Sequence, residues 1–434
     1  MRALTTHTQT STTTEHPDTG MFRSLRVRNY RLYASGQLVS LTGTWMQRVA
    51  QDWLVLELTN SGTALGIVTA LQFGPSLLLG LWGGILADRG DKRRLLLATQ
   101  SALAVVALLL GLLDIAGIVQ YWQVLVLATC LGLVTAIDTP VRQSFVVEMV
   151  GRPELTNAVG INSTIFNLGR ILGPAVAGVM ISAVGTGWAF VANAVSSVGV
   201  LGALLMMRPA ELFPSPPLAR ARGQLREGFR YVKERRDLVL TMVLIFVFGT
   251  FGLNFAITCA LMAKQVFHKG ASGYGLLSTA LAVGAFCGAI LATRRTQRPS
   301  AMFLLGMAAA FSVGEIASGL MPNFLWTAIA LMPTGLAMLS LTTAANANVQ
   351  LGVDPTMRGR VMSLYLICFM GGTPLGAPII GWVAGVAGPR WGLVGGGLVC
   401  LLSAFGLAVA LARHRGMHPG DVAELVSTRV RAAA

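Results

Sequence analysis

Long apolar stretches dominate this chain, and short polar segments separate them. Each stretch has about twenty residues, enough for an α-helix to cross a hydrocarbon layer of ~30 Å. Strands of a membrane β-barrel would instead alternate apolar and polar residues over segments of about ten residues, and this alternation is absent. The pattern predicts an all-α membrane protein with twelve spans, at residues 31–57, 63–87, 95–118, 121–147, 156–183, 187–207, 238–262, 272–293, 300–320, 323–349, 360–386 and 391–412.

Composition agrees with a membrane protein. Hydrophobic residues make up 54% of the chain and charged residues 12%, whereas soluble domains carry about 25% charged residues. The five cysteines all lie in predicted spans without CxxC spacing, so we interpret them as buried apolar side chains. The sequence therefore predicts neither a metal site nor a cofactor.

The net charge of +15 is distributed unevenly. Of the 33 Lys and Arg residues, 28 belong to the N-terminus, to the loops after even-numbered spans with the adjoining span ends, or to the C-terminal tail. Because Lys and Arg accumulate on the cytoplasmic side, this distribution predicts that both termini are cytoplasmic in a multi-pass plasma (inner) membrane protein. Nucleic-acid binding is a poor alternative explanation of the charge.

One long polar segment divides the chain into six spans and six spans. It begins with a proline-rich coil and ends in a basic, helix-compatible stretch. Residues 1–22 are polar and threonine-rich, which predicts disorder and no cleavable signal peptide. We expect a disordered cytoplasmic N-terminus at 1–22, an N-terminal six-helix bundle at 23–207, a cytoplasmic linker at 208–237, a C-terminal six-helix bundle at 238–412 and a cytoplasmic tail at 413–434.

The two halves of the chain resemble each other. A shift of 203 residues superimposes 139–178 on 342–381 without a gap, so that glycines coincide at 169 and 372, 173 and 376, and 178 and 381. Similar halves of the same topology are typical of transporters built from parallel repeats, which bind their substrate between the halves.

The segment "GGILADRGDKRR" after span 2 is similar to the loop 2–3 motif of the major facilitator superfamily, and the resemblance covers most of the chain. It implies two pseudo-symmetric six-helix bundles. The segments "RPELTNAVGINSTIFNLGRILGPAVAG" and "GTPLGAPIIG" further resemble the bacterial subfamily of enterobactin-exporter-like and multidrug efflux proteins. The motif departs from the superfamily pattern at residues 90–92, and it matches at Gly84, Asp88, Arg89, Arg93 and Arg94.

The resemblance implies that this motif latches the two halves together in the outward-open state. Asp88 would accept hydrogen bonds and pair with Arg142, Arg358 or Arg360, while Gly84 would let spans 2 and 11 approach closely. The second half has Thr293 in place of Asp88, so the latch would be one-sided. A simpler interpretation is a cytoplasmic turn whose charges only fix the topology.

Span 5 contains a glycine- and proline-rich motif. Small residues at four-residue spacing allow helices to approach closely, and a proline can bend the axis. The resemblance makes a Gly-Pro motif on this span typical of antiporters, which favours export; ordinary tight packing is the alternative. The packing motif comprises Gly169, Gly173, Pro174 and Gly178, with Gly376 and Gly381 in the second half.

Four ionisable residues inside spans are candidates for proton coupling. Arg170 lies about fourteen residues into its span, ~21 Å from the inner face, and needs a partner there. Asp138 could pair with Arg170 or with Arg142, or it could only satisfy backbone groups freed by Pro140. Arg48 and Asp52 are four residues apart and could form a proton-sensitive or an interfacial pair.

Polar residues recur at helical spacing on span 1 and are expected to line a central cavity. Asp114 and Glu315, which are related by the repeat, are interpreted as residues at the level of the lipid headgroups. The cavity candidates are Gln37, Thr44, Gln47, Gln51, Asn162, Asn167, Asn254 and Tyr365.

Motifs of several enzyme classes are missing from the sequence. It contains no GxxxxGK[ST] phosphate loop, no HExxH and no GxSxG, so we expect no enzyme activity. The prediction is a proton-coupled exporter of small amphipathic molecules of drug or siderophore type, functional as a monomer in the lipid bilayer. The alternative is a facilitator-fold importer or uniporter of a metabolite.

Overall fold

The computed structural model describes residues 20, 22–213, 224–295 and 297–414, and over these ranges the chain is helical without β-strands. Residues 1–19 and 21 of the predicted disordered N-terminus, and residues 415–434 of the predicted tail, lie outside the described residues. The elements are η1 Arg23–Arg26, α1 Arg28–Thr59, α2 Gly62–Arg89, α3 Lys92–Ile115, α4 Tyr121–Val184, α5 Thr186–Met206, η2 Pro209–Glu211, α6 Gln224–Glu234, α7 Arg236–Val247, η3 Phe248–Gly252, α8 Phe255–Leu261, η4 Met262–Val266, α9 Ala271–Thr293, α10 Ala301–Leu320, α11 Phe324–Gly352, α12 Arg358–Ala387 and α13 Pro389–His414.

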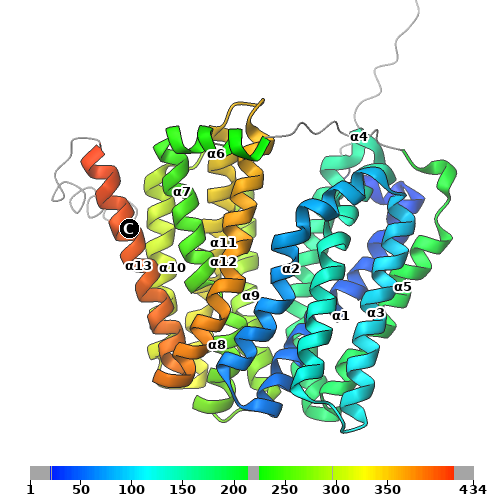
Figure 1. The fold of residues 1–434 in the computed structure, drawn as a ribbon, viewed down its shortest axis with the longest axis horizontal. Coiled ribbons are helices and arrows are strands. Elements are labelled where there is room, and N and C mark those ends of the chain that lie inside the picture. Colours follow the sequence, from blue (N-terminus) through cyan, green and yellow to red (C-terminus); the bar gives the residue numbers. More distant parts are fainter. Residues whose placement is uncertain (1–19, 21, 214–223, 296, 415–434) are drawn as a thin grey trace, which may run out of the picture.

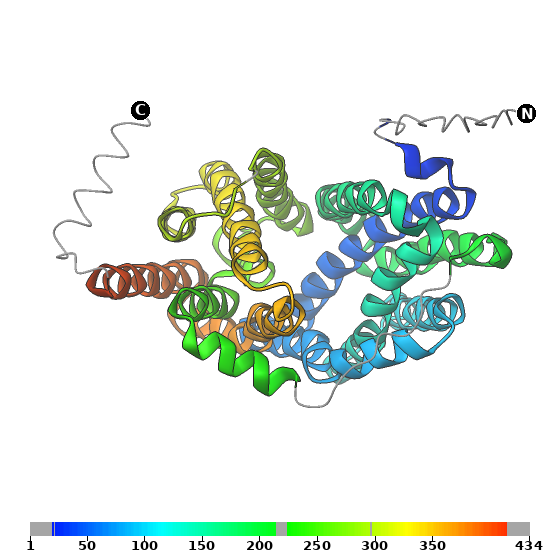
Figure 2. The same cartoon turned by 90° about the horizontal axis from the view of Figure 1, so that it is seen from above.

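The long helices form two groups that stand side by side (Figures 1 and 2). We call α1–α5 the N-bundle and α7–α13 the C-bundle. The short helix α6 lies at one end of the C-bundle, where Arg360 pairs with Glu227 at 2.8 Å and Tyr231 donates a hydrogen bond to Asp354 at 2.9 Å. The end of the predicted linker is therefore a helix attached to the C-bundle.

Ten helical segments in the described part of the chain are long and apolar enough to cross a membrane. One of them, α4, has 64 residues and bends at Gly151, where φ is 70°; at ~1.5 Å per residue it is long enough for two passes. Helix α1 has 32 residues and is long enough to cross a membrane, but its charged and amide residues make it less hydrophobic than these ten segments. The predicted spans 4 and 5 therefore correspond to the two helical parts of α4 on either side of Gly151, whose backbone angles are not helical, and span 1 corresponds to the more polar helix α1.

Span 7 is the least regular of the predicted spans. It consists of α7 and α8 with two π-helical segments, η3 and η4, and 61% of its most apolar window is buried. Because π-helical turns are usually short insertions into α-helices, the backbone of this span deviates from that of α1, its counterpart in the first half.

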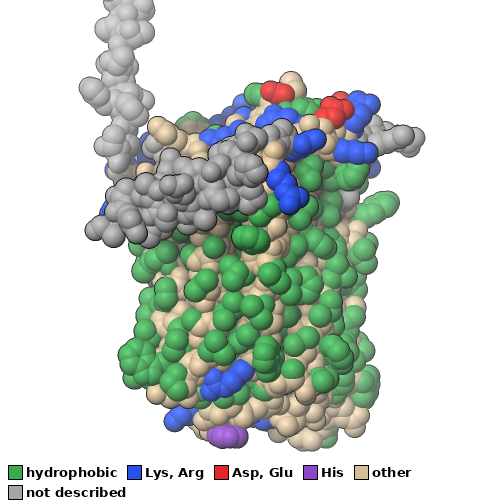
Figure 3. Space-filling model, turned by 90° about the vertical axis from the view of Figure 1, so that its left-hand side faces the viewer, with side chains coloured by type: hydrophobic (Ala, Val, Ile, Leu, Met, Phe, Trp, Pro, Cys, Tyr) green, Lys and Arg blue, Asp and Glu red, His purple; other side chains and the backbone are tan. Residues whose placement is uncertain are grey.

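The two ends of the molecule differ in charge. Lys and Arg gather at the end that carries α6, and a hydrophobic band covers the side of the molecule below them (Figure 3). We call this the basic end. The basic end also carries the α2–α3 turn and the bend of α4. The α1–α2 and α12–α13 turns lie at the other end of the molecule, which we call the opposite end.

Repeat-related glycines make equivalent contacts in the two bundles. A Cβ at Gly173 would collide with Trp45 of α1, and a Cβ at Gly376 would collide with the backbone of Thr250 in η3. The turns that follow these helices contain Gly185 and Gly388, whose φ angles are 91° and 99°. The shift of 203 residues therefore relates positions with the same structural role.

A second set of small residues joins one bundle to the other. A Cβ at Gly178 of α4 would lie 3.0 Å from the Cα of Ser272 in α9. A Cβ at Gly62 of α2 would lie 2.7 Å from the carbonyl oxygen of Gly381 in α12. Both crossings lie in the half of the molecule near the opposite end, and glycine permits both.

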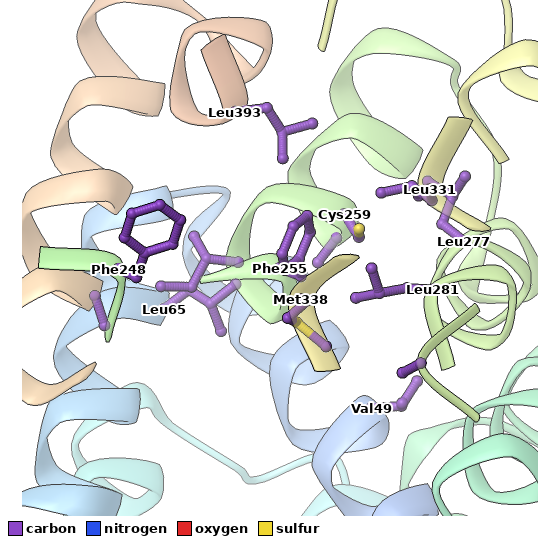
Figure 4. Packing of buried hydrophobic residues seen from close by; sticks show 14 of the residues in the cluster. Val49, Leu65, Phe248, Phe255, Cys259, Leu277, Leu281, Leu331, Met338 and Leu393 are labelled. Atoms are coloured by element: carbon purple, nitrogen blue, oxygen red, sulfur yellow. The ribbon is translucent and has the colours of Figure 1, made fainter. Parts of the chain in front are cut away.

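The buried apolar residues divide into two clusters. The smaller cluster lies in the N-bundle near the basic end and includes Tyr33 and Phe145. The larger cluster contains the core of the C-bundle together with N-bundle residues from the half near the opposite end, such as Val49 and Leu65 (Figure 4). The bundles thus share a hydrophobic core near the opposite end only.

We predict that Gly376→Ala lowers the stability of the protein. The new methyl group would overlap the Thr250 backbone, which cannot move aside as a flexible side chain would, and overpacking of this kind costs about 1–3 kcal/mol. The measurement is the midpoint of thermal unfolding in detergent. Gly406→Ala on α13 is the control, since no atom lies within 4 Å of its Cβ position; equal midpoints for the two variants would contradict the prediction.

Candidate functional site

Side-chain hydrogen bonds join the two bundles near the opposite end. Tyr274 of α9 donates to Oδ2 of Asp52 on α1 at 2.6 Å, and both residues are buried. Lys264 donates to the carbonyl oxygen of Leu56 at 2.5 Å, and Gln265 donates to that of Asn60 at 3.2 Å. Together with the glycine crossings and the shared core, these bonds hold this end closed.

The predicted latch residues lie at the basic end, but two of the three cations expected around Asp88 pair with other carboxylates in this structure. Arg142 pairs with Asp138, Arg360 pairs with Glu227, and Arg358 is exposed. The resemblance assigns the latch to the outward-open state, in which the opposite end would be open. The latch therefore stays a prediction.

Arg93 and Asp91 of the motif hold the α2–α3 turn. Arg93 donates to the carbonyl oxygens of Leu204 and Leu205 at 2.7 and 3.1 Å, which fixes the start of α3 to the end of α5. Asp91 caps α3 by accepting a hydrogen bond from the Arg94 backbone at 3.0 Å, and Arg89 is exposed.

Asp138 of α4 is the centre of a buried polar cluster. Its Oδ1 atom accepts hydrogen bonds from Thr99 Oγ1 and Gln100 Nε2, both at 2.8 Å. Its Oδ2 atom lies 2.8 Å from the guanidinium of Arg142, one helical turn further along α4. The carboxylate is completely buried, so the cation and the two donors compensate for the loss of hydration.

Arg48 and Arg170 are placed differently from the predicted pairs. The guanidinium of Arg48 lies over the ring of Trp45, 4.6 Å from its centroid, and 5.6 Å from that of Phe73. It does not form an ion pair with Asp52. Arg170 does not pair with Asp138 either; Arg142, four residues after Asp138, forms that ion pair.

The cavity candidates fall into two groups. Some are buried inside their own bundle: Gln47 accepts a hydrogen bond from Asn193 of α5, Gln37 donates to Tyr33 at 2.7 Å, and Gln51 is 2% exposed. Asn254 and Tyr365 are buried as well, and donate to the carbonyl oxygens of Thr250 and Thr342. The partly exposed group consists of Thr44, Asn162 and Asn167.

Glu315, which the sequence analysis placed at the level of the lipid headgroups, is buried inside the C-bundle. It is 2% exposed, and its Oε1 atom would lie 3.3 Å from a Cβ at Gly396 of α13. The helix α10 turns this side chain toward α13 rather than outward. Distance from the helix end could not reveal this direction.

Several residues that complete these contacts were not singled out from the sequence. Thr99 and Gln100 form a polar pair within the apolar span 3, a signal that could have identified them. Tyr274 lies near the start of α9, 222 residues from Asp52, and no spacing in the sequence links the two.

We predict energetic coupling between Asp138 and Arg142. Because Asp138 is buried, Arg142→Gln should lower the midpoint of thermal unfolding by several degrees. In a protein that already carries Asp138→Asn, Arg142→Gln should lower the midpoint much less. The four proteins of the double-mutant cycle are compared in detergent. The exposed pair Arg94 and Asp91, 3.4 Å apart, provides a matched cycle without coupling. Additive effects at both pairs would contradict the prediction.

Comparison with known proteins places these features in a family. A profile of the family described as transmembrane secretion effector matches residues 19–426. The staphyloferrin A transporter of Staphylococcus aureus is 25% identical over 389 residues, which cover 86% of this chain and 95% of that protein. The macrolide efflux protein A of Streptococcus pyogenes is 22% identical, and the alignment covers 79% of this chain and 86% of that protein. The enterobactin exporter of Citrobacter koseri is 23% identical, and the alignment covers 86% of this chain and 91% of that protein.

Solved structures resemble the fold. A bacterial homolog of the human lysosomal transporter Spinster, in an inward-facing and unoccupied conformation, aligns with a TM-score of 0.70 at 17% identity and covers 87% of this chain; the alignment spans 95% of that protein. The nucleoside transporter NupG aligns with a TM-score of 0.70 at 11% identity, and 87% of this chain and 98% of that protein are covered. These similarities confirm the predicted two-bundle fold.

Proposed function

Since the chain belongs to the transmembrane secretion effector family of the major facilitator superfamily, we propose that it is a proton-coupled exporter of small amphipathic molecules. The relatives named above are a siderophore transporter, a siderophore exporter and a macrolide efflux protein. Their names support drugs or siderophores as the substrate class for this chain. Transport would proceed by alternating access, in which the two bundles rock about a site between them.

The observation that carries this proposal is the one-sided contact between the bundles. In the described part of the chain, the hydrogen bonds that join α1 to α8–η4 and α9, such as Asp52 to Tyr274, lie near the opposite end. The buried apolar cluster of the N-bundle near the basic end contains no residue of the C-bundle. Such an arrangement corresponds to one of two states, and a carrier needs a second state in which these contacts separate.

Two acids are suited to coupling with protons, for different reasons. Asp52 accepts a hydrogen bond from Tyr274 across the bundle boundary, so its protonation would weaken a contact that closes the opposite end. Asp138 holds Arg142, so its protonation would release a cation near the basic end. A proton drives transport only if it changes the balance between the two states, and Asp52 supports this role because its hydrogen bond with Tyr274 joins the two bundles.

The orientation in the membrane is part of the proposal. The basic end would face the cytoplasm of a bacterial inner membrane, in accordance with the distribution of Lys and Arg. The closed end would then be the outer one, and the structure would correspond to the state that loads substrate from the cytoplasm. We propose that a single chain is the functional unit, because each chain provides both bundles.

The direct test is expression in an efflux-deficient bacterium, with antibiotics, dyes and siderophores as substrates. We expect the cells to retain less of at least one compound, and an uncoupler to abolish the difference because the proton gradient drives export. Efflux that persists in the uncoupler would contradict proton coupling. Greater retention of a compound on expression would instead support the importer.

We predict that Asp88→Asn abolishes efflux while the amount of protein in the membrane stays near normal. The latch needs the negative charge of Asp88 in the outward-open state, and the asparagine removes it without changing the side-chain volume. Asp91→Asn in the same turn is the matched control, because asparagine also caps helices well. Normal efflux by the Asp88→Asn variant would disprove the latch.

A further inference from the structure

Two arginines lie in the middle of the N-bundle, far from either membrane surface. Arg48 precedes the end of α1 at Thr59 by eleven residues, and Arg170 precedes the end of α4 at Val184 by fourteen. At ~1.5 Å per residue, these distances correspond to roughly 16 and 21 Å from the opposite end, within a hydrocarbon layer of ~30 Å.

The two side chains belong to the same contact region. Helix α4 packs on α1 through Gly169 and Gly173, which lie against Leu41 and Trp45. Arg170 follows Gly169 directly and lies within electrostatic range of Arg48, so the two positive charges repel each other. Both side chains are partly exposed.

The neighbouring acids do not neutralise this pair. Asp138 is bound to Arg142, and Asp52 accepts the hydrogen bond from Tyr274. The charge of Asp52 attracts that of Arg48 without a direct contact. Over the described ranges, Arg170 forms neither an ion pair nor a hydrogen bond. The site thus holds three guanidiniums and two carboxylates, an excess of one positive charge.

Apolar and aromatic surfaces surround the two cations. Trp45 lies between Arg48, which is above its ring, and Phe166, whose ring is 5.6 Å away in an edge-to-face arrangement. Phe73 of α2 borders Arg48 on another side. Phe166 is 44% exposed, so an aromatic or aliphatic group has a surface to bind beside the charges.

An unpaired cation at this depth is unfavourable unless it gains an anionic partner in some functional state. We propose that Arg48 and Arg170 form a subsite for the carboxylate of an amphipathic anionic substrate, whose apolar part binds to Trp45, Phe73 and Phe166. Guanidiniums bind carboxylates with paired, charge-assisted hydrogen bonds. The proposal rests on the exporter function above, because it assigns a chemical class to the exported molecule.

The test uses two xanthene dyes of similar size, anionic carboxyfluorescein and cationic rhodamine 123. Binding to the purified full-length protein in detergent is measured by fluorescence anisotropy. We expect tighter binding of the anion. Arg48→Gln and Arg170→Gln should each raise the Kd of carboxyfluorescein at least about tenfold, as expected when a charge-assisted hydrogen bond is lost. The Kd of rhodamine 123 should not increase.

Two controls separate a binding role from a structural one. Arg31→Gln removes an exposed arginine from the same helix and should leave both Kd values unchanged. Arg170→Lys keeps the charge and should recover part of the affinity for the anion. A Kd of carboxyfluorescein that is unchanged in both glutamine variants, or that changes equally for both dyes, would overturn the proposal.

A measurement on the unsubstituted protein avoids variants that fail to fold. Phenylglyoxal modifies accessible arginines, and mass spectrometry follows each site. Carboxyfluorescein should slow the modification of Arg48 and Arg170 but not of Arg31, and rhodamine 123 should protect none of them. Absence of protection would count against the subsite.

Failure of this proposal is distinguishable from failure of the exporter function. The subsite would be refuted, and export left intact, by two results together. Cells that express Arg170→Gln would still export rhodamine 123, and the unsubstituted protein would bind carboxyfluorescein no more tightly than rhodamine 123. Selective binding of carboxyfluorescein by a protein that exports no compound would refute export and leave the subsite intact.

Discussion

The structure depends on close contact between helices at positions without a side chain. Lipid is as apolar as the helix surfaces, so burial of apolar area does little to bring one helix to another, and van der Waals contact must do so. Contact of this kind is strongest where backbones approach each other. Gly173 against α1 and Gly376 against η3 hold each bundle together, and Gly178 and Gly381 allow the bundles to touch. The buried polar groups are positioned by this packing.

Most of the fold was predictable from the sequence, because hydrophobicity and repetition are properties of the chain itself. Apolar stretches identified the spans, including α1, whose charged and amide residues make it less apolar than the others. The shift of 203 residues anticipated that Gly173 and Gly376 would have the same role. The sharp kink at Gly151, which joins spans 4 and 5 almost without a loop, is a property of backbone angles and was not predictable.

The candidate site was only partly predictable, because its contacts depend on the directions of side chains. The pair of Asp138 and Arg142 follows from their spacing of four residues on one helix. The same spacing suggested a pair of Arg48 and Asp52, but Arg48 lies over Trp45, and Tyr274 bonds Asp52 instead. Aromatic surfaces compete with carboxylates for guanidiniums, and distant segments supply donors. Neither effect can be detected from spacing along one helix.

The irregular span 7 has a consequence for the mechanics of the two halves. In the N-bundle, the corresponding helix α1 is continuous over 32 residues, whereas span 7 is divided by the π-helical segments η3 and η4. A π-helical turn can migrate or revert to α-helix by shifting hydrogen bonds by one residue, which changes the length and rotation of the segment beyond it. The duplicated halves are therefore alike in topology but differ in the hydrogen-bond register of their first helix. A protein made of two copies of the first half would reproduce the glycine crossings, yet it would lack the π-helical turns of span 7.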